Sequence, residues 1–181
     1  VSNTLDSIDN AFIECSKNNF IGMITLPLRK DLIIKNLMKN FIGHTEYLQK
    51  LDKKKFSNMI LAHKKIIVTP ITTHISLKSV SKVTSNKVYL YKKLISIYDT
   101  IKKDFNIRNP KLLISGLNPH SGENGKIGVE EEKFIIPTLK KLKKNKYIIA
   151  GPVAGDSMIN AVNLKKFDCF IFFYHDQALI P

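Results

Sequence analysis

The sequence FDCFIFFYHDQ (residues 167–177) joins an almost continuous apolar run to three polar residues. Such a run is typical of a strand that is buried on both faces of a sheet. Apolar runs of similar character lie at residues 20–26, 66–69, 111–117 and 147–150. Stretches with apolar residues at helical spacing alternate with these runs. The alternation predicts an α/β fold with a mostly parallel sheet flanked by helices.

The helical pattern is clearest at residues 86–105, where apolar residues repeat every three or four positions. Further helices are expected at residues 4–17, 30–40, 46–52, 129–145 and 156–163. Asn3 or Thr4 would cap the first of these, and Pro137 should kink or break the helix that contains it. The faces expected to be buried are Leu5, Ile8, Phe12 and Cys15 in the first helix, and Ile34, Leu37 and Met38 in the second.

Composition excludes several classes of protein. Hydrophobic residues make up 44% of the 181 residues, so most of the chain is not disordered. The apolar run at residues 167–174 is far shorter than the roughly 20 residues that a membrane span needs. No secretory signal opens the chain, and Cys15 and Cys169 cannot form a disulfide scaffold. Free thiols and a cytoplasmic location are therefore expected.

The formal net charge of +14 raises the question of nucleic-acid binding. Arg29 and Arg108 are the only arginines, so lysine supplies 27 of the 29 basic residues. Arginine is the residue that grips phosphates and bases bidentately, and the lysine runs lack the interleaved aromatics that single-strand binders use. We interpret the charge as a solvated lysine surface and expect no nucleic-acid partner.

Three of the five histidines follow predicted strands directly. His74 comes after the run at 66–69, His120 after 111–117, and His175 after 167–174. If these strands are parallel neighbours, their carboxyl ends converge, and ligands bind at such edges. Three neutral imidazoles suit Zn²⁺ and similar cations. The separations of 46 and 55 residues form no local metal motif, so the plainer alternative is that each is a surface or hydrogen-bonded histidine.

Two aspartates also lie in loops that follow predicted strands. Asp176 could orient His175 as the carboxylate partner of a metal-bound imidazole, or act only as a loop residue or helix cap. Asp156 could cap the next helix or belong to an active site. The glycine-bearing loop at 121–128 is neither a dinucleotide fingerprint nor a phosphate-binding P-loop. Cys169 is expected to be a buried core thiol.

Several motifs, taken together, indicate a protein family more specifically than any one of them does alone. They are TLPLRK (25–30), GHTE (43–46), THISL (73–77), GLNPHSGENG (116–125), GPVAGD (151–156) and YHDQ (174–177). In this order they closely resemble the PdxA family of 4-hydroxythreonine-4-phosphate dehydrogenases, which acts in vitamin B6 biosynthesis. The family's opening glycine-rich segment and its closing segment have no counterpart, so the resemblance implies that residues 1–181 are the central portion of a two-domain dehydrogenase. The internal boundary is not evident from the sequence.

The resemblance also implies an architecture and a site. The family fold is like that of isocitrate and isopropylmalate dehydrogenases, without the usual dinucleotide fingerprint. His74, His120 and His175 would be the ligands of a divalent cation, either zinc, magnesium, manganese or cobalt. His44 and Thr45 would bind substrate, and Asp156 would be a catalytic carboxylate. No cofactor-binding residue can be assigned. The family is a homodimer with its active site near the subunit interface, so the ligands need not all come from one chain.

The implied reaction oxidises 4-phosphooxy-L-threonine with NAD⁺ or NADP⁺ to 2-amino-3-oxo-4-phosphooxybutanoate, which loses CO₂ to give 3-amino-2-oxopropyl phosphate. The alternatives are a dehydrogenase of the same family acting on a phospho-threonate or phospho-erythronate, and an inactive remnant. Three departures from the family pattern are seen, one of which is the mild change to AGDS (154–157) where the family commonly has PADT. Ser121 stands where alanine is common, and Ala178 stands where glycine is common. Ala178 would be strained if its position required a positive φ.

Overall fold

The computed structural model describes residues 2–180 and divides into two compact units, with the division between Ser57 and Asn58. The two chain ends, Val1 and Pro181, lie outside the described residues. Each unit is described by itself below. All five strands of the described chain belong to the second unit, whereas the first unit is built from helices and extended segments.

The second unit is organised around one sheet with the strand order β1-β2-β5-β3-β4. These strands span Leu61–His63, Ile66–Pro70, Cys169–Phe172, Leu112–Ser115 and Ile149–Val153, in the order of the sheet. The pairs β2–β5, β5–β3 and β3–β4 are parallel, and only β1 pairs antiparallel, with β2. The predicted α/β fold with a mostly parallel sheet is therefore confirmed. The strand β5 lies between β2 and β3 and is fully buried.

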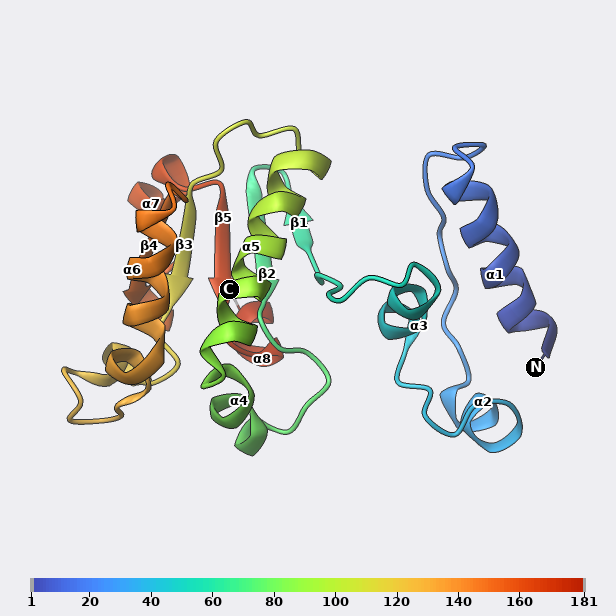
Figure 1. Cartoon of the computed structure of the whole chain (residues 1–181), viewed down its shortest axis with the longest axis horizontal. Helices are drawn as coiled ribbons and strands as arrows, with labels where there is room; N and C mark the ends of the chain where they lie inside the picture. The colour runs from blue at the N-terminus through green and yellow to red at the C-terminus, as the bar shows by residue number, and fades with distance from the viewer. Residues whose placement is uncertain (1, 181) are drawn as a thin grey trace. The chain divides into compact units, whose positions relative to one another are not determined.

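Helices cover both faces of this sheet (Figure 1). Side chains of β5 alternate between two cores, because neighbouring residues of a strand point to opposite faces. Cys169 and Ile171 belong to a core that includes residues of α5 (Lys87–Asp104) and α6 (Ile136–Lys144). Phe170 and Phe172 belong to a core on the other face, together with Ala178 of α8 (His175–Leu179) and residues beside α7 (Ala161–Lys166). Double coverage explains why the sequence of β5 is apolar throughout.

Local sequence signals account for the ends of the main helices. The side chain of Asn86 accepts hydrogen bonds from the backbone of Val88 and Tyr89 and caps α5, and Asn160 caps α7 in the same way. Pro137 lies in the first turn of α6, directly after a π-helical turn, Glu131–Ile135. The predicted break at Pro137 is thus seen as a change of helix type.

The first unit contains α1 (Ser2–Ser16), α2 (Lys30–Asn36) and α3 (His44–Leu51). Its core consists of five buried side chains: Leu5, Ile8, Ile33, Phe41 and Tyr47. The Tyr47 hydroxyl donates to Asp9 Oδ1 at 2.7 Å. Burial and this aspartate raise the pKa of Tyr47 to about 12.

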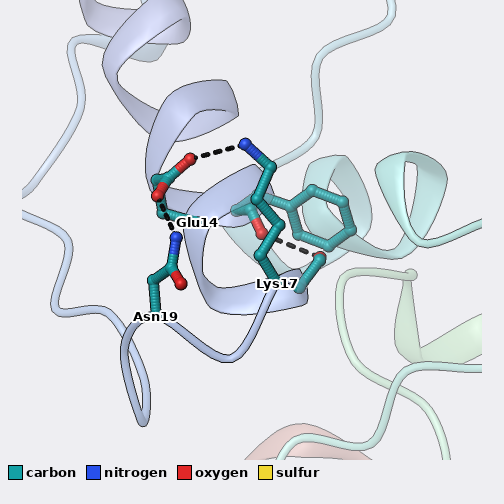
Figure 2. A network of polar contacts seen from close by, with 5 residues as sticks. Glu14, Lys17 and Asn19 are labelled. Atoms are coloured by element: carbon teal, nitrogen blue, oxygen red, sulfur yellow. Dashed lines mark hydrogen bonds and ion pairs between the residues drawn. The ribbon is translucent and has the colours of Figure 1, made fainter.

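The end of α1 is held by a polar network around Glu14 (Figure 2). Lys17 Nζ donates to Glu14 Oε1 at 2.9 Å, and Asn19 Nδ2 donates to Oε2 at 2.6 Å. The Asn19 amide and then the Lys17 ammonium hold the pKa of the Glu14 carboxyl below its usual range. The network joins the last turn of α1 to the chain that leaves it.

Three predicted features of the first unit are wrong, namely one strand, one buried helix face and one helix cap. Residues 20–26 form no strand; Ile21 and Ile24 are fully exposed, because the described part of this unit contains no other strand with which they could pair. In α2 the buried residue is Ile33, while Ile34 and Leu37 are exposed. Asn3 and Thr4 lie inside α1 rather than before it.

In the second unit the errors concern short elements. The helix predicted at 156–163 is a 3₁₀ turn, Gly155–Ser157, followed by α7. The strand β1, the helix α4 (Leu77–Thr84) and the helix α8 were not predicted. Among the helices of residues 2–180, none combines the length and apolar character that crossing a bilayer requires.

Candidate active site at the carboxyl edge of the sheet

Three adjacent parallel strands end at one edge of the sheet (Figure 1). The segments that follow them carry the three predicted histidines: His74 after β2, His175 at the start of α8 after β5, and His120 in the turn Pro119–Gly122 after β3. The expectation that these strands are parallel neighbours is confirmed. Ligand sites of open α/β sheets form at this edge.

His74 and His175 form a pair. Their ring centroids lie 6.5 Å apart with an interplanar angle of 38°. Both line a cavity of about 300 Å³, together with Thr73, Tyr174 and Asp176. Nδ1 of His175 lies 2.8 Å from Oδ1 of Asp176, as expected for a carboxylate that orients an imidazole. Nε2 is thus the ring nitrogen of His175 that remains for a ligand.

His120 lies with Asp156 on a second, larger cavity of about 620 Å³. Asn118, Tyr174 and Gln177 also line it. Tyr174 lines the first cavity as well, so the two cavities are neighbours. Asp156 is exposed in the first turn after β4, and the cap of the following α7 is Asn160 rather than Asp156. The position of Asp156 therefore agrees with the alternative of an active-site carboxylate better than with that of a helix cap.

The donor types fit a divalent cation, but the described side chains do not form a complete cluster. Imidazole nitrogens with a carboxylate behind one of them are a common ligand set for zinc-like ions. Within residues 2–180, however, no group of three or more His, Cys, Asp or Glu side chains lies close enough to hold a metal ion. The structure brings His74 to His175, and His120 to Asp156, without bringing the three imidazoles to one point.

His44 and Thr45 are the first two residues of α3 in the first unit. His44 lines a cavity of about 530 Å³ between α1 and residues 23–28. Its Nε2 atom is buried and has no hydrogen-bond partner among the described groups. A buried polar atom without a partner is costly, which agrees with a ligand-binding role for this imidazole.

Gln177 ties the ends of two strands together and was not predicted. Its Oε1 accepts from Phe173 N at 2.9 Å and from Ser115 Oγ at 3.2 Å, while its Nε2 donates to Gly116 O at 3.0 Å. The side chain thus joins the ends of β3 and β5 beneath the larger cavity. Its place in the motif YHDQ was the one available signal.

The loop that carries His120 has an unusual backbone. Residues 120–125 all have positive φ, including the non-glycine residues His120 (50°), Ser121 (51°), Glu123 (47°) and Asn124 (54°). Left-handed backbone costs an L-residue roughly 1–2 kcal/mol, and such strain gathers at functional sites. In contrast, Ala178 lies in the helix α8 and is not among the positive-φ residues, so its replacement of glycine brings no strain.

Comparison with known proteins identifies relatives of this chain. A 4-hydroxythreonine-4-phosphate dehydrogenase from Sulfurihydrogenibium sp. (strain YO3AOP1) is 38% identical over 175 residues, 96% of this chain and 53% of the relative. The protein of the same name from Wigglesworthia glossinidia brevipalpis is 36% identical over 97% of this chain and 52% of its own length. The chain therefore spans about half the length of the curated relatives that it matches.

Solved structures agree. A crystal structure of 4-hydroxythreonine-4-phosphate dehydrogenase from Klebsiella pneumoniae matches with a TM-score of 0.85 and 28% identity, covering 96% of this chain and 52% of that one. A terephthalate 1,2-cis-dihydrodioldehydrogenase from Burkholderia xenovorans LB400 matches with a TM-score of 0.71 at 20% identity, which shows a shared fold alone. The family model described as "Pyridoxal phosphate biosynthetic protein PdxA" matches residues 2–181. On this evidence the chain belongs to the PdxA family.

Proposed function

We propose that this chain is the central part of an oxidoreductase that oxidises 4-hydroxythreonine 4-phosphate in pyridoxal phosphate biosynthesis, using NAD⁺ or NADP⁺ and a divalent cation. The main support is that His74, His120 and His175 follow three adjacent parallel strands. Relatives that are named 4-hydroxythreonine-4-phosphate dehydrogenase support the substrate. The product, 2-amino-3-oxo-4-phosphooxybutanoate, would then lose CO₂ to give 3-amino-2-oxopropyl phosphate.

In this proposal His74, His120 and His175 hold the cation. When bound, the cation supplies Lewis-acid stabilisation of an oxygen that loses its proton, and the nicotinamide supplies the hydride acceptor. Asp176 holds the ring of His175 through Nδ1. Asp156 faces the same cavity as His120 and is the candidate for proton transfer. His44 and Thr45 bind the substrate.

The active assembly is proposed to be a cytoplasmic homodimer with the active site near the subunit interface. A ligand set completed by a second subunit would reconcile the separated imidazoles of one chain with a full cation site. No nucleic-acid or membrane partner is part of the proposal.

The test is NADH formation from 4-phosphooxy-L-threonine by the protein of the complete reading frame, with and without a chelator. We expect chelator-sensitive activity that falls on the order of 10²–10³-fold in His120→Ala, because Lewis-acid stabilisation is worth several kcal/mol. His63→Ala is the matched control, since His63 is exposed on the edge strand β1 and should change little.

The other outcomes separate the alternatives. A protein that binds the cation but does not oxidise this substrate would be tested with a phospho-threonate and a phospho-erythronate. A protein with neither activity nor bound cation would contradict the three-histidine site and leave an inactive remnant.

A further inference from the structure

Glu131 is a buried carboxylate next to the loop that carries His120. It begins the π-helical turn before α6, and only 2% of its surface is exposed. Its Oε1 accepts hydrogen bonds from the backbone N–H groups of Leu117 and Asn118, each at 2.8 Å. Its Oε2 accepts from the side-chain amide of Asn118 at 2.9 Å. One side chain thus satisfies three donors in the segment that immediately precedes His120.

The loop is also packed tightly against this carboxylate. A Cβ atom placed on Gly122 would lie 2.6 Å from Glu131 Oε2, and one placed on Gly116 would lie 2.8 Å from the Cα of Ser121. Real side chains do not approach so closely, so Glu131 and the Gly128 carbonyl leave no room for a side chain at Gly122, and Ser121 leaves none at Gly116. The left-handed backbone that begins at His120 thus packs closely against Glu131 at Gly122.

Two neighbouring carboxylates differ from Glu131 in their contacts. Glu130 accepts from Asn118 Nδ2 at 2.9 Å and from Ser81 Oγ at 3.1 Å, and its backbone hydrogen bonds are at Val129 and Glu130 itself, not at Leu117 or Asn118. The Asn118 amide, with smaller contributions from other donors, holds the pKa of Glu130 below its usual range although burial opposes this. Glu132 is exposed. Of the three, only Glu131 binds the loop backbone.

We propose that Glu131 is a positioning residue that fixes the backbone of Leu117 and Asn118 and thereby directs His120 into the larger cavity. Charge-assisted bonds from backbone N–H groups to a buried carboxylate are strong and geometrically specific. What His120 binds rests on the function proposed above. The positioning itself rests only on contacts within residues 116–131.

The experiment uses the chain with isotope-labelled histidine, without metal, and compares Glu131→Ala and Glu131→Gln with the matched control Glu132→Ala. The His120 ring signals are identified by their loss in His120→Gln. We expect Glu131→Ala to shift or broaden the His120 signals while those of His74 and His175 stay in place. Glu131→Gln should have a smaller effect, because one oxygen can still accept from the two backbone N–H groups while its amide faces that of Asn118.

A titration with Zn²⁺ follows on the same samples. Loss of a group that orients a ligand typically costs 10–100-fold in metal affinity, so about this loss is expected in Glu131→Ala and no change in Glu132→Ala. Cooperative thermal unfolding checks that each variant is folded. If Glu131→Ala does not fold, Glu131→Gln is judged by the same signals.

Unchanged His120 signals in a folded variant would overturn the proposal, as would equal shifts of all three histidines, which would indicate a general effect on the fold. If the unsubstituted chain binds no Zn²⁺ but the His120 signals still respond selectively to Glu131→Ala, the positioning role stands and the proposed cation site fails. The two hypotheses are therefore separable.

Discussion

Lys93 is a charged side chain within the core-facing surface of α5, with 6% of its surface exposed. Burial lowers its pKa from 10.5 to about 8. Below pH 8 the ammonium is charged in both the folded and the unfolded chain, and burying this charge destabilises the folded state. Between pH 8 and 10.5 the unfolded chain binds more protons, so stability should rise with pH in this window.

Lys93→Met should therefore stabilise the chain at pH 7, by on the order of 1–3 kcal/mol, because each unit of pKa shift corresponds to about 1.4 kcal/mol. The gain should diminish toward pH 10.5. Denaturant unfolding at several pH values measures it. Lys92→Met is the control, since Lys92 is the exposed neighbour on the same helix. A gain that does not change with pH would contradict this explanation.

Ser121 carries a buried hydroxyl with no hydrogen-bond partner among the described groups. Ser121→Ala removes the hydroxyl. It leaves the cost of the positive φ at this position unchanged, because alanine and serine both have a Cβ. We expect a gain of about 1 kcal/mol in unfolding free energy, which is the lower end of the cost of an unsatisfied buried group. In Ser85→Ala the lost hydroxyl is exposed and donates to Lys82 O at 2.8 Å, so no gain is expected there. Lower stability of Ser121→Ala would mean that the hydroxyl has a partner in solution.

At the scale of elements, the edge that carries the candidate site is held together by side chains rather than by the sheet alone. Gln177 joins β3 to β5, and Glu131 joins the π-helical turn to the loop after β3. Both side chains also contact backbone groups beyond the strand ends, Gly116 and Phe173 for Gln177, and Leu117 and Asn118 for Glu131. The loops at this edge therefore have defined positions without belonging to regular structure.

Gln177→Glu tests the first of these contacts. The carboxylate can still accept from Phe173 N, but it places an oxygen against Gly116 O, where the amide donated before. We expect a loss of about 1–3 kcal/mol at pH 7. The loss should shrink as the pH falls toward about 4, because the protonated carboxyl can donate again.

The same substitution at Gln49 is the control. Gln49 Nε2 donates to the carbonyl oxygens of Lys54 and Lys55 in contact with solvent, so water can replace the lost bonds. Equal losses at the two positions would show that the bridge between β3 and β5 contributes nothing specific.

At the scale of the whole molecule, each hydrophobic core lies within one of the two units that meet after Ser57. The two larger cores lie entirely within residues 58–181, and the smaller one lies entirely within the first unit. All the paired strands also belong to residues 58–181. The described chain thus contains one unit with a five-stranded sheet and one with a small helical core.

We expect residues 58–181 to fold alone, with a cooperative thermal transition close to that of the same unit in residues 1–181. Residues 1–57 alone should show no cooperative transition, because chains of this length with small cores are marginal. Calorimetry of the two fragments and the whole chain measures this. A cooperative transition of residues 1–57, or none of residues 58–181, would contradict it.

Much of the fold could be predicted because it depends on local patterns. The apolar runs predicted β2, β3 and β5, and the helical repeat predicted α5 to within one residue at each end. The run at residues 20–26 has the same local pattern but forms no strand, since a strand also needs a partner. Short elements such as β1 carry too few residues for a pattern to be distinctive.

The sequence by itself determined the strands β2, β3 and β5 and the helix α5 of the second unit, and which histidines follow the strands, because both are set within a few residues of chain. Only the tertiary structure decided that β5 lies between β2 and β3, and that Glu131 and Gln177 hold the loops beyond them. Contacts between the strands and their loops join segments far apart in the chain. Thr72, for example, donates to the carbonyl oxygen of Phe173, 101 positions away. Their choice depends on the packing of the whole sheet, which no local pattern contains.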